Sequence, residues 1–322
     1  MKLLYIGVCR ENLEKFYPEY IAGEFREGHI TRDELVQTIE KDGIDVLMVD
    51  VFNFVFDSAL LEKLRGRIRQ INFLYQSVSS LIDHGKAAEC DIKITKLPDD
   101  VYCNEVAEFA LAQLLCASKG LVQFDLSVRQ GQWNQALTTN LTLRGKTLGV
   151  VGFGNIGRRI VELCGCWGME TLVVKRDLAR HPPIANVSWV GIDQLLQESD
   201  CVVLAIPLTE ETRQMLDAKA IQRMKRHAIL INVSRGDLVD GEAVIAALKD
   251  GHLGYYCADV FRQEPLPIGD PLSTCAKTIL SPHVAWCTGE TLRRSFELWS
   301  KQLIPNDLGG AGRLSLSSKG MA

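Results

Sequence analysis

One stretch of the sequence indicates the fold most clearly: Thr147-Leu-Gly-Val-Val-Gly-Phe-Gly-Asn-Ile-Gly157. A short apolar run of strand character meets a G-x-G-x-x-G pattern, within which a helical pattern begins. The first glycine permits a tight turn, the second lets a ligand approach the backbone, and the third lets helix and strand pack closely. A pyrophosphate could then meet the positive end of the helix. The stretch predicts a dinucleotide-binding turn at Gly152, Gly154, Asn155, Ile156 and Gly157; the alternative is a tight turn that holds no ligand.

On both sides of this stretch, strand patterns alternate with helical patterns. The expected strands are Lys2–Val8, Val46–Val51, Ile71–Tyr75, Thr147–Gly152, Glu170–Val174, Cys201–Ala205, Ala228–Asn232, Tyr255–Asp259 and Thr278–Leu280. The expected helices are Thr31–Lys41, Ser58–Arg65, Glu105–Ser118, Ile156–Cys166, Gln214–Met224, Gly241–Lys249 and Glu290–Leu303. Such alternation is typical of βαβ units and a parallel sheet.

The length of 322 residues favours two domains. We therefore predict an α/β protein with two doubly wound parallel-sheet domains, one flavodoxin-like and one Rossmann. Residues 1–100 plus 289–322 are expected to form a substrate or lid domain. Residues 101–288 are expected to form the dinucleotide-binding domain, because they contain the glycine pattern.

Composition excludes several classes of protein. The net charge of −4 argues against broad binding to nucleic acid or to anionic membranes, since both need a basic face. No apolar run approaches the roughly 18 residues of a membrane span. The ten cysteines include no C-x-x-C pair, so neither a disulfide framework nor a metal site is expected. These features predict a cytoplasmic chain.

The end of the strand that follows the glycine pattern selects the dinucleotide. An acidic residue about 20 positions beyond the pattern commonly binds the ribose 2′-hydroxyl of NAD. Here Lys175 stands at about that position, Arg176 follows it, and the first acid is Asp177. Because a Lys-Arg pair attracts a 2′-phosphate, we predict that NADP(H) is preferred. The alternative is that Asp177 turns inward and binds NAD(H).

Three further polar residues, Arg235, Glu264 and His283, each follow the end of an expected strand. Ligands of open α/β sheets bind outside the carboxyl ends of the strands. Arginine can grip a carboxylate with two hydrogen bonds, histidine can transfer a proton near neutral pH, and a carboxylate can orient the imidazole. With a nicotinamide hydride, these residues suit the reduction of a 2-oxo acid. The alternatives are a structural ion pair and a loop histidine without a chemical role. The other histidines are expected at the surface: His29, His84, His181, His227 and His252.

Many ordered strings between about Ile71 and Arg294 identify a family resemblance. They are Glu105-Val-Ala-Glu108, Arg129-Gln-Gly-Gln-Trp133, Leu143-Arg-Gly-Lys-Thr-Leu-Gly149, the glycine pattern, Ser199-Asp-Cys-Val-Val-Leu-Ala-Ile-Pro-Leu-Thr209, Met224-Lys225, Asn232–Asp240, Asp259-Val-Phe with Glu264-Pro-Leu-Pro267, and Pro282-His283. In these strings the chain resembles the D-isomer-specific 2-hydroxyacid dehydrogenases.

The resemblance implies a role for each matched residue. Arg235 would bind the substrate carboxylate, His283 would be the acid/base, and Glu264 would be its partner. The implied cofactor contacts, besides the glycines, are Asn155, Ile156, Lys175, Pro207, Val233, Asp259 and Ala285. The resemblance also implies a cleft between the two domains and a homodimer built on the cofactor domain.

The chain departs from the family pattern in the loop Gln76-Ser-Val-Ser-Ser80, where glycine amides usually meet the substrate. Serine hydroxyls could serve as donors instead. The candidate substrate-binding residues are Ser77, Val78, Ser79, Arg235, His283 and Trp286. In having a tryptophan at position 286, the chain resembles glyoxylate and hydroxypyruvate reductases. This resemblance favours small polar 2-oxo acids as substrates. Ordinary packing of Trp286 is the alternative.

Two other functions stay open at the level of sequence. One is a related dehydrogenase that acts on another anion, such as phosphite or a larger 2-oxo acid, as the altered loop would allow. The other is a dinucleotide-sensing interaction module like the corepressors of this family, which can keep the same three polar residues. The acidic balance of the chain disfavours the second.

Overall fold

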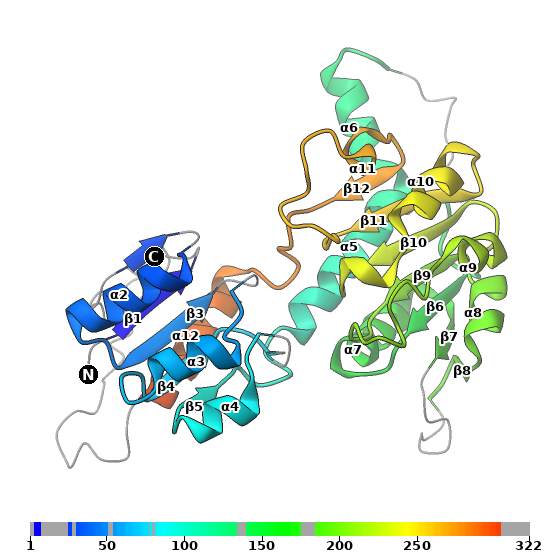
Figure 1. The fold of residues 1–322 in the computed structure, drawn as a ribbon. Helices are drawn as coiled ribbons and strands as arrows, with labels where there is room; N and C mark the ends of the chain where they lie inside the picture. The colour runs from blue at the N-terminus through cyan, green and yellow to red at the C-terminus, as the bar shows by residue number, and fades with distance from the viewer. Residues whose placement is uncertain are drawn as a thin grey trace, which may run out of the picture. The chain divides into compact units, whose positions relative to one another are not determined.

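The computed structural model describes residues 3–7, 25–27, 30–50, 54–76, 78, 81–133, 140–174 and 184–303. The chain divides between Val101 and Tyr102, and again between Thr288 and Gly289, into two compact units (Figure 1). Residues up to 101 and from 289 onward belong to the first unit, and the residues between belong to the second. The two α/β units confirm the predicted fold class. That the first is a substrate domain stays a prediction.

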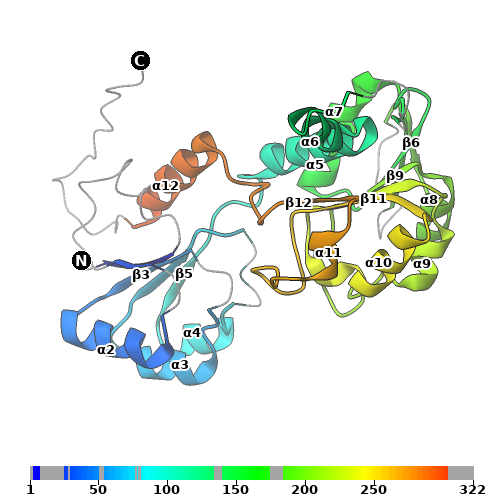
Figure 2. The ribbon, with the colours of Figure 1, turned by 90° about the horizontal axis from the view of Figure 1, so that it is seen from above.

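The described part of the first unit is built on five parallel strands in the order β2-β1-β3-β4-β5. The strands are β1 (Leu3–Gly7), β2 (Phe25–Glu27), β3 (Val46–Asp50), β4 (Gln70–Phe73) and β5 (Lys93–Thr95). The helices are α2 (Arg32–Asp42), α3 (Ser58–Leu64), α4 (His84–Glu89) and α12 (Gly289–Leu303). Helices α2, α3 and α4 cover one face of this sheet and α12 covers the other (Figure 2). The strand order is that of flavodoxin-like folds.

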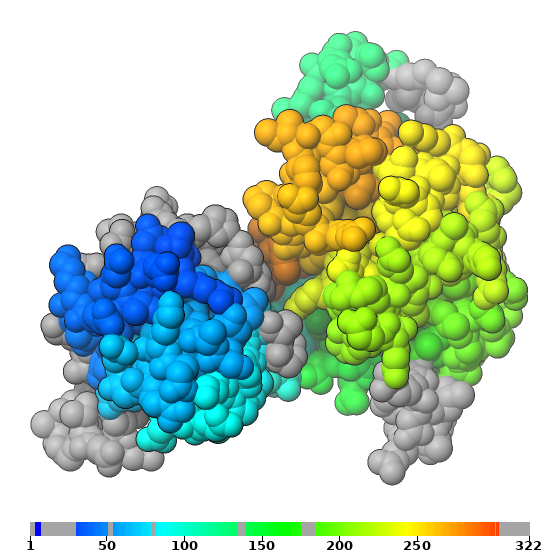
Figure 3. Space-filling view, in the orientation of Figure 1, coloured from blue at the N-terminus to red at the C-terminus, as the bar shows by residue number. Residues whose placement is uncertain are grey.

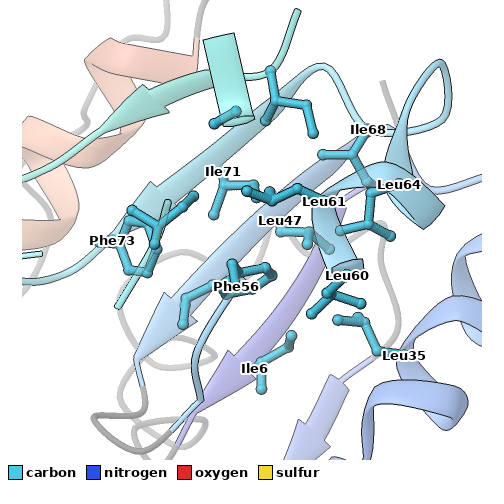
Figure 4. Packing of buried hydrophobic residues seen from close by; sticks show 14 of the residues in the cluster. Ile6, Leu35, Leu47, Phe56, Leu60, Leu61, Leu64, Ile68, Ile71 and Phe73 are labelled. Carbon is cyan, nitrogen blue, oxygen red and sulfur yellow. The ribbon is translucent and has the colours of Figure 1, made fainter. Parts of the chain in front are cut away.

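Packing on the α2–α4 face of the sheet explains why this apolar sequence folds there. Phe56 and Phe73 meet edge to face, with ring centroids 5.9 Å apart. Leu47 of β3 and Leu61 of α3 are fully buried beside them (Figure 4). Every residue of β3 is buried, as expected for a parallel strand that is covered on both faces.

The described part of the second unit is built on seven parallel strands in the order β12-β11-β10-β9-β6-β7-β8. The strands are β6 (Thr147–Val151), β7 (Glu170–Val174), β8 (Val187–Trp189), β9 (Cys201–Leu204), β10 (Ala228–Asn232), β11 (Leu253–Ala258) and β12 (Thr278–Leu280). The helices are α5 (Cys103–Lys119), α6 (Leu121–Arg129), α7 (Asn155–Cys164), α8 (Ile192–Glu198), α9 (Ala218–Arg223), α10 (Gly241–Lys249) and α11 (Pro271–Thr274). The order reverses at β6, as in doubly wound dinucleotide-binding sheets.

Two local expectations were wrong. The helix expected over Gln214–Met224 is shorter, because the Asp217 carboxylate caps α9 at Ala218 and Gln214 has a φ of 49°. His252 is buried rather than at the surface, and its Nε2 lies 2.9 Å from the carbonyl oxygen of Ile221. His84 and His227 are exposed as expected, whereas His29 and His181 lie outside the described residues.

Several short elements were absent from the expected set, among them β2, β5, β8, α4, α8 and α11. Each has seven residues or fewer, which is too few to show a clear period in sequence. The nine-residue helix α6 was also missed; in the described chain none of its residues is buried.

Candidate active site

The glycine turn lies between β6 and α7, and each glycine meets a different steric demand. Gly152 has a φ of 104°, and a Cβ there would lie 2.4 Å from the carbonyl oxygen of Ala205. A Cβ on Gly157 would lie 2.1 Å from the carbonyl oxygen of Gly152. A Cβ on Gly154 would meet no atom within 4 Å. The turn therefore packs tightly at its first and third glycines and is open at the second.

This open position coincides with the start of α7. Gly154 is the N-cap of the helix, and no side chain caps the first-turn N–H groups. No acidic residue lies in that turn. The N–H groups at the start of a helix and the helix dipole both favour an anion at such a position. The turn thus fits the pyrophosphate of a dinucleotide. Asn155 is exposed and Ile156 is half-buried at the same end of the helix.

The sheet register brings the other candidates to the same edge. Val151 is paired with Leu204, Leu204 with Asn232, Asn232 with Ala258, and Ala258 with Leu280. Each of these five residues is the last of its strand. The residues that follow therefore start from one row along the carboxyl edge of the sheet, where open α/β folds bind ligands.

The predicted cofactor residues lie along or just beyond this row. Pro207 is exposed, whereas Val233, Asp259 and Ala285 are buried. Lys175 and Arg176, the predicted ribose residues, lie outside the described residues.

A histidine–carboxylate pair lies beyond the same edge. The Nδ1 atom of His283 is 2.7 Å from Oε2 of Glu264, and the N–H of Phe261 donates to Oε1 of Glu264 at 2.8 Å. Burial by itself raises the pKa of Glu264, but the hydrogen bonds from His283 and Phe261 and the charges of His283 and Arg235 outweigh it. The pKa of Glu264 therefore lies below its ordinary value, and the carboxylate is ionised at neutral pH.

The loop that carries His283 is hydrogen-bonded to the carboxylate of Asp259. Oδ1 of Asp259 accepts hydrogen bonds from Ser281 Oγ at 2.6 Å and from the Val284 N–H at 2.9 Å. Oδ2 accepts from the Ala285 N–H at 2.8 Å. Burial raises the pKa of Asp259, although these three hydrogen bonds act in the opposite direction. Asp259 was predicted as a cofactor contact, and that stays a prediction. The structure shows that its carboxylate holds this loop through three hydrogen bonds.

Arg235 is exposed on the second unit, and Asn232 holds the loop that carries it. The buried side chain of Asn232 donates to the Arg235 carbonyl oxygen at 2.9 Å and accepts from the Ser234 N–H at 3.1 Å. A Cβ on Gly236 would lie 2.0 Å from the carbonyl carbon of Phe261, so glycine lets this loop approach the one that bears Glu264.

Three positioning residues near this edge, Asn232, Gly236 and Ser281, were given no role in the sequence reasoning. Asn232 was detectable as a polar residue that ends an otherwise apolar strand. Gly236 and Ser281 gave no such signal, because both act through contacts between distant loops.

The substrate-loop candidates belong to the first unit. Val78 is buried, and its carbonyl oxygen accepts from the Leu81 N–H at 2.9 Å. The Lys96 ammonium donates to the carbonyl oxygen of Gln76 at 2.8 Å and so holds the start of the loop. Ser77 and Ser79 lie outside the described residues.

Comparisons with known proteins agree with this geometry. Residues 111–285 match the model of the D-isomer specific 2-hydroxyacid dehydrogenase, NAD binding domain. The chain belongs to the D-isomer specific 2-hydroxyacid dehydrogenase family. It is an NAD(P)-dependent enzyme of that family.

Named relatives of this dehydrogenase span most of its length. A glyoxylate reductase of Thermofilum pendens is 33% identical over 89% of this chain and 84% of its own length. One of Korarchaeum cryptofilum is 38% identical over 69% of this chain and 68% of its own length. The crystal structure of a glyoxylate reductase from Paecilomyes thermophila, 25% identical, covers 94% of each chain with a TM-score of 0.78.

The described residues of this dehydrogenase contain neither a cluster of metal ligands nor a membrane-spanning helix. No group of three or more histidine, cysteine, aspartate or glutamate side chains there could hold a metal ion. None of the helices in the same residues has the length and apolar character needed to cross a membrane.

Proposed function

We propose that this dehydrogenase reduces a small 2-oxo acid, of the glyoxylate or hydroxypyruvate kind, to a D-2-hydroxy acid and prefers NADPH. The observation that carries the proposal is the 2.7 Å contact between His283 Nδ1 and an ionised Glu264 at the edge that also bears the glycine turn. Relatives named glyoxylate reductase that span most of the chain support the choice of substrate class.

The Glu264 carboxylate orients the imidazole for proton transfer. Since Glu264 is ionised, Nδ1 of His283 carries the hydrogen of their bond, which leaves Nε2 to hold the second proton. The reduced nicotinamide, when bound, supplies a hydride to the carbonyl carbon. In such a reduction the carbonyl π electrons would move to oxygen, and Nε2 of His283 would donate the proton that this oxygen takes. Glu264 stabilises the imidazolium that donates it.

Arg235 is the proposed binder of the substrate carboxylate. Its guanidinium is a permanent cation with a planar fork of donors that matches a carboxylate. Asn232 fixes the backbone from which this side chain extends. A carboxylate held here would place the neighbouring carbonyl in the field of the guanidinium, which stabilises negative charge on its oxygen. Ser77, Val78 and Ser79 of the first unit complete the proposed substrate contacts.

The preference for NADPH rests on Lys175 and Arg176. Two cations at the end of the second strand of the dinucleotide unit would pair with a 2′-phosphate.

The cysteine usage of the chain predicts a cytosolic location. Cell fractionation would check this prediction.

The experiment that tests the function is an absorbance assay of purified protein with NADPH and with NADH. Glyoxylate, hydroxypyruvate, pyruvate, 2-oxobutyrate and phenylpyruvate form the substrate panel. Fast oxidation of NADPH with glyoxylate or hydroxypyruvate is the expected result. Turnover of phenylpyruvate alone would contradict the substrate class, a higher kcat/KM with NADH would contradict the cofactor preference, and dinucleotide binding without turnover of any 2-oxo acid would contradict the reaction.

We propose further that the enzyme is a homodimer that uses α6. None of the nine residues of this helix is buried in the described chain, and Leu121, Leu126 and Val128 are 59%, 52% and 54% exposed. Trp133 nearby is 77% exposed. The helix stands at the outer edge of its unit (Figure 3). An apolar surface of this kind is costly in water and favours a second copy of the chain as its cover.

Replacement of Leu121 and Leu126 by glutamate is expected to halve the molar mass in light scattering, because charge would be buried unpaired in the interface. Gln222→Glu, at an exposed position of α9, is the control and should keep the mass of the wild type. A wild-type protein of monomer mass would contradict the dimer.

A further inference from the structure

The backbone conformation of His283 is an uncommon one. Its φ of 56° falls in the left-handed region, where a residue other than glycine is uncommon. A residue keeps such a conformation only where its surroundings hold it there. Which groups hold His283 is therefore a question about the catalytic geometry.

Hydrogen bonds fix both polar groups of this residue's backbone. The His283 N–H donates to the carbonyl oxygen of Asp259 at 2.8 Å. The His283 carbonyl oxygen accepts from the indole Nε1–H of Trp286 at 3.2 Å. The indole is thus a side-chain donor to the His283 carbonyl group, and this hydrogen bond opposes relaxation of His283 toward an ordinary φ.

The indole is itself held in place. The ring of Trp286 packs against the ring of Tyr102, with centroids 5.3 Å apart and planes tilted by 50°. Tyr102 is buried and is the N-cap of the 17-residue helix α5. Tyr102 and Trp286 also lie within two residues of the two points at which the chain passes between its units. The Trp286 side chain thus links His283 to a long, well-packed helix.

We propose that Trp286 is a positioning residue of the proposed reductase: its indole N–H holds the left-handed backbone of His283, which keeps the imidazole on Glu264. This inference rests on the proposed role of His283. It differs from the sequence-based expectation that Trp286 lines the substrate pocket, because a pocket wall affects substrate binding, whereas a positioning residue affects proton transfer.

The test replaces Trp286 by phenylalanine, which keeps an aromatic ring against Tyr102 and removes the indole donor. The expected result is a fall in kcat of roughly tenfold, the scale of one hydrogen bond, with unchanged KM values for glyoxylate and NADPH. Trp167→Phe is the matched control, since Trp167 lies in the short 3-10 turn Gly165–Trp167, which contains none of the proposed site residues. An unchanged kcat, or a raised KM for glyoxylate with the kcat of the wild type, would overturn the proposal.

A second readout does not depend on turnover. The amides of Val284 and Ala285 donate to Asp259, so their hydrogen exchange, followed by mass spectrometry of a peptide over residues 281–287, reports on the loop. Exchange is expected to be faster in Trp286→Phe and unchanged in Trp167→Phe.

A third variant covers the case in which Trp286→Phe does not fold. Tyr102→Leu keeps the indole donor but removes its support, and faster exchange of the same peptide is expected. Unchanged exchange in every folded variant would refute the positioning role. If the wild-type protein turns over no 2-oxo acid, the proposed function fails, and the exchange data alone decide the role of Trp286.

Discussion

At the scale of single residues, the proposed chemistry depends on one pair, Glu264 and His283. Hydrogen bonds from His283 and Phe261 and the charges of nearby side chains outweigh the burial of Glu264, so its carboxylate is ionised at neutral pH. Its Oε2 lies 2.7 Å from Nδ1 of His283. The backbone of His283 is left-handed, and the next two N–H groups of its loop donate to Asp259. The proposed catalytic geometry is therefore a property of a loop as well as of two side chains.

The first prediction concerns the proton donor. His283→Gln is expected to lower kcat by about 100-fold or more, the scale of general acid catalysis, because glutamine keeps polarity but cannot transfer the proton. The Kd for NADPH, measured by fluorescence titration, should change little. His227→Gln, at an exposed position, is the matched control. Wild-type turnover in His283→Gln would remove this residue from the mechanism.

The second prediction concerns the stability supplied by Glu264. Because its pKa is lower in the folded protein than its ordinary value of 4.5, the ionised group stabilises the fold above that value. This contribution is lost as pH falls through the folded pKa. Glu264→Gln should therefore unfold at lower urea concentration than the wild type at pH 7, and the difference should shrink below about pH 4. A difference that grows on acidification would contradict the assignment.

At the scale of elements, the glycine turn shows why one spacing serves both folding and binding. Gly157 is needed because helix α7 touches the turn itself: a Cβ there would lie 2.1 Å from a backbone oxygen. The fold itself does not require glycine at position 154, since the space beside it is empty and its φ of −77° suits any residue. We therefore propose that Gly154 serves binding, whereas Gly157 serves packing.

The third prediction uses that difference. Gly154→Ala should leave the thermal midpoint of the ligand-free protein unchanged but raise the Kd for NADPH, because its methyl group occupies the space for the pyrophosphate. Gly157→Ala should lower the unfolding free energy by about 1–3 kcal/mol through overpacking. Calorimetry and cofactor titration of both variants check this. Equal effects of the two substitutions on stability would contradict the separation of roles.

At the scale of the whole molecule, cofactor binding and stability are linked. A ligand that binds only the folded state stabilises it by RT ln(1 + [L]/Kd), which is about 2.7 kcal/mol at 100 times Kd. The tighter dinucleotide must therefore raise the thermal midpoint further at equal concentration.

The fourth prediction follows from the proposed preference. NADPH should raise the thermal midpoint more than NADH, and Lys175→Asp should reverse that order, since an acid repels a 2′-phosphate and accepts from a ribose hydroxyl. Lys249→Asp, at the end of α10, is the matched change of charge and should leave the order unaltered. A wild-type protein stabilised more by NADH would contradict the preference.

By itself the sequence determined the α/β class, the glycine turn and the family, because these depend on local features: an apolar run, three glycines at fixed spacing, and strings such as Asn232–Asp240. It also singled out Glu264 and His283, since both are polar residues just past the ends of strands. No such pattern marks the features that were predicted wrongly or not at all. These are the burial of His252, the short length of helix α9 and the exposed helix α6.

How those residues are held depends on contacts between distant parts of the chain. The register that aligns five strand ends, the hydrogen bonds from the loop after β12 to Asp259, and the contact of Trp286 with Tyr102 all join residues that are far apart in the chain. No local pattern encodes such contacts, because they form only when the sheet and its loops pack together. The left-handed φ of His283 was not visible in the sequence for the same reason, since the neighbours that hold it come from several loops.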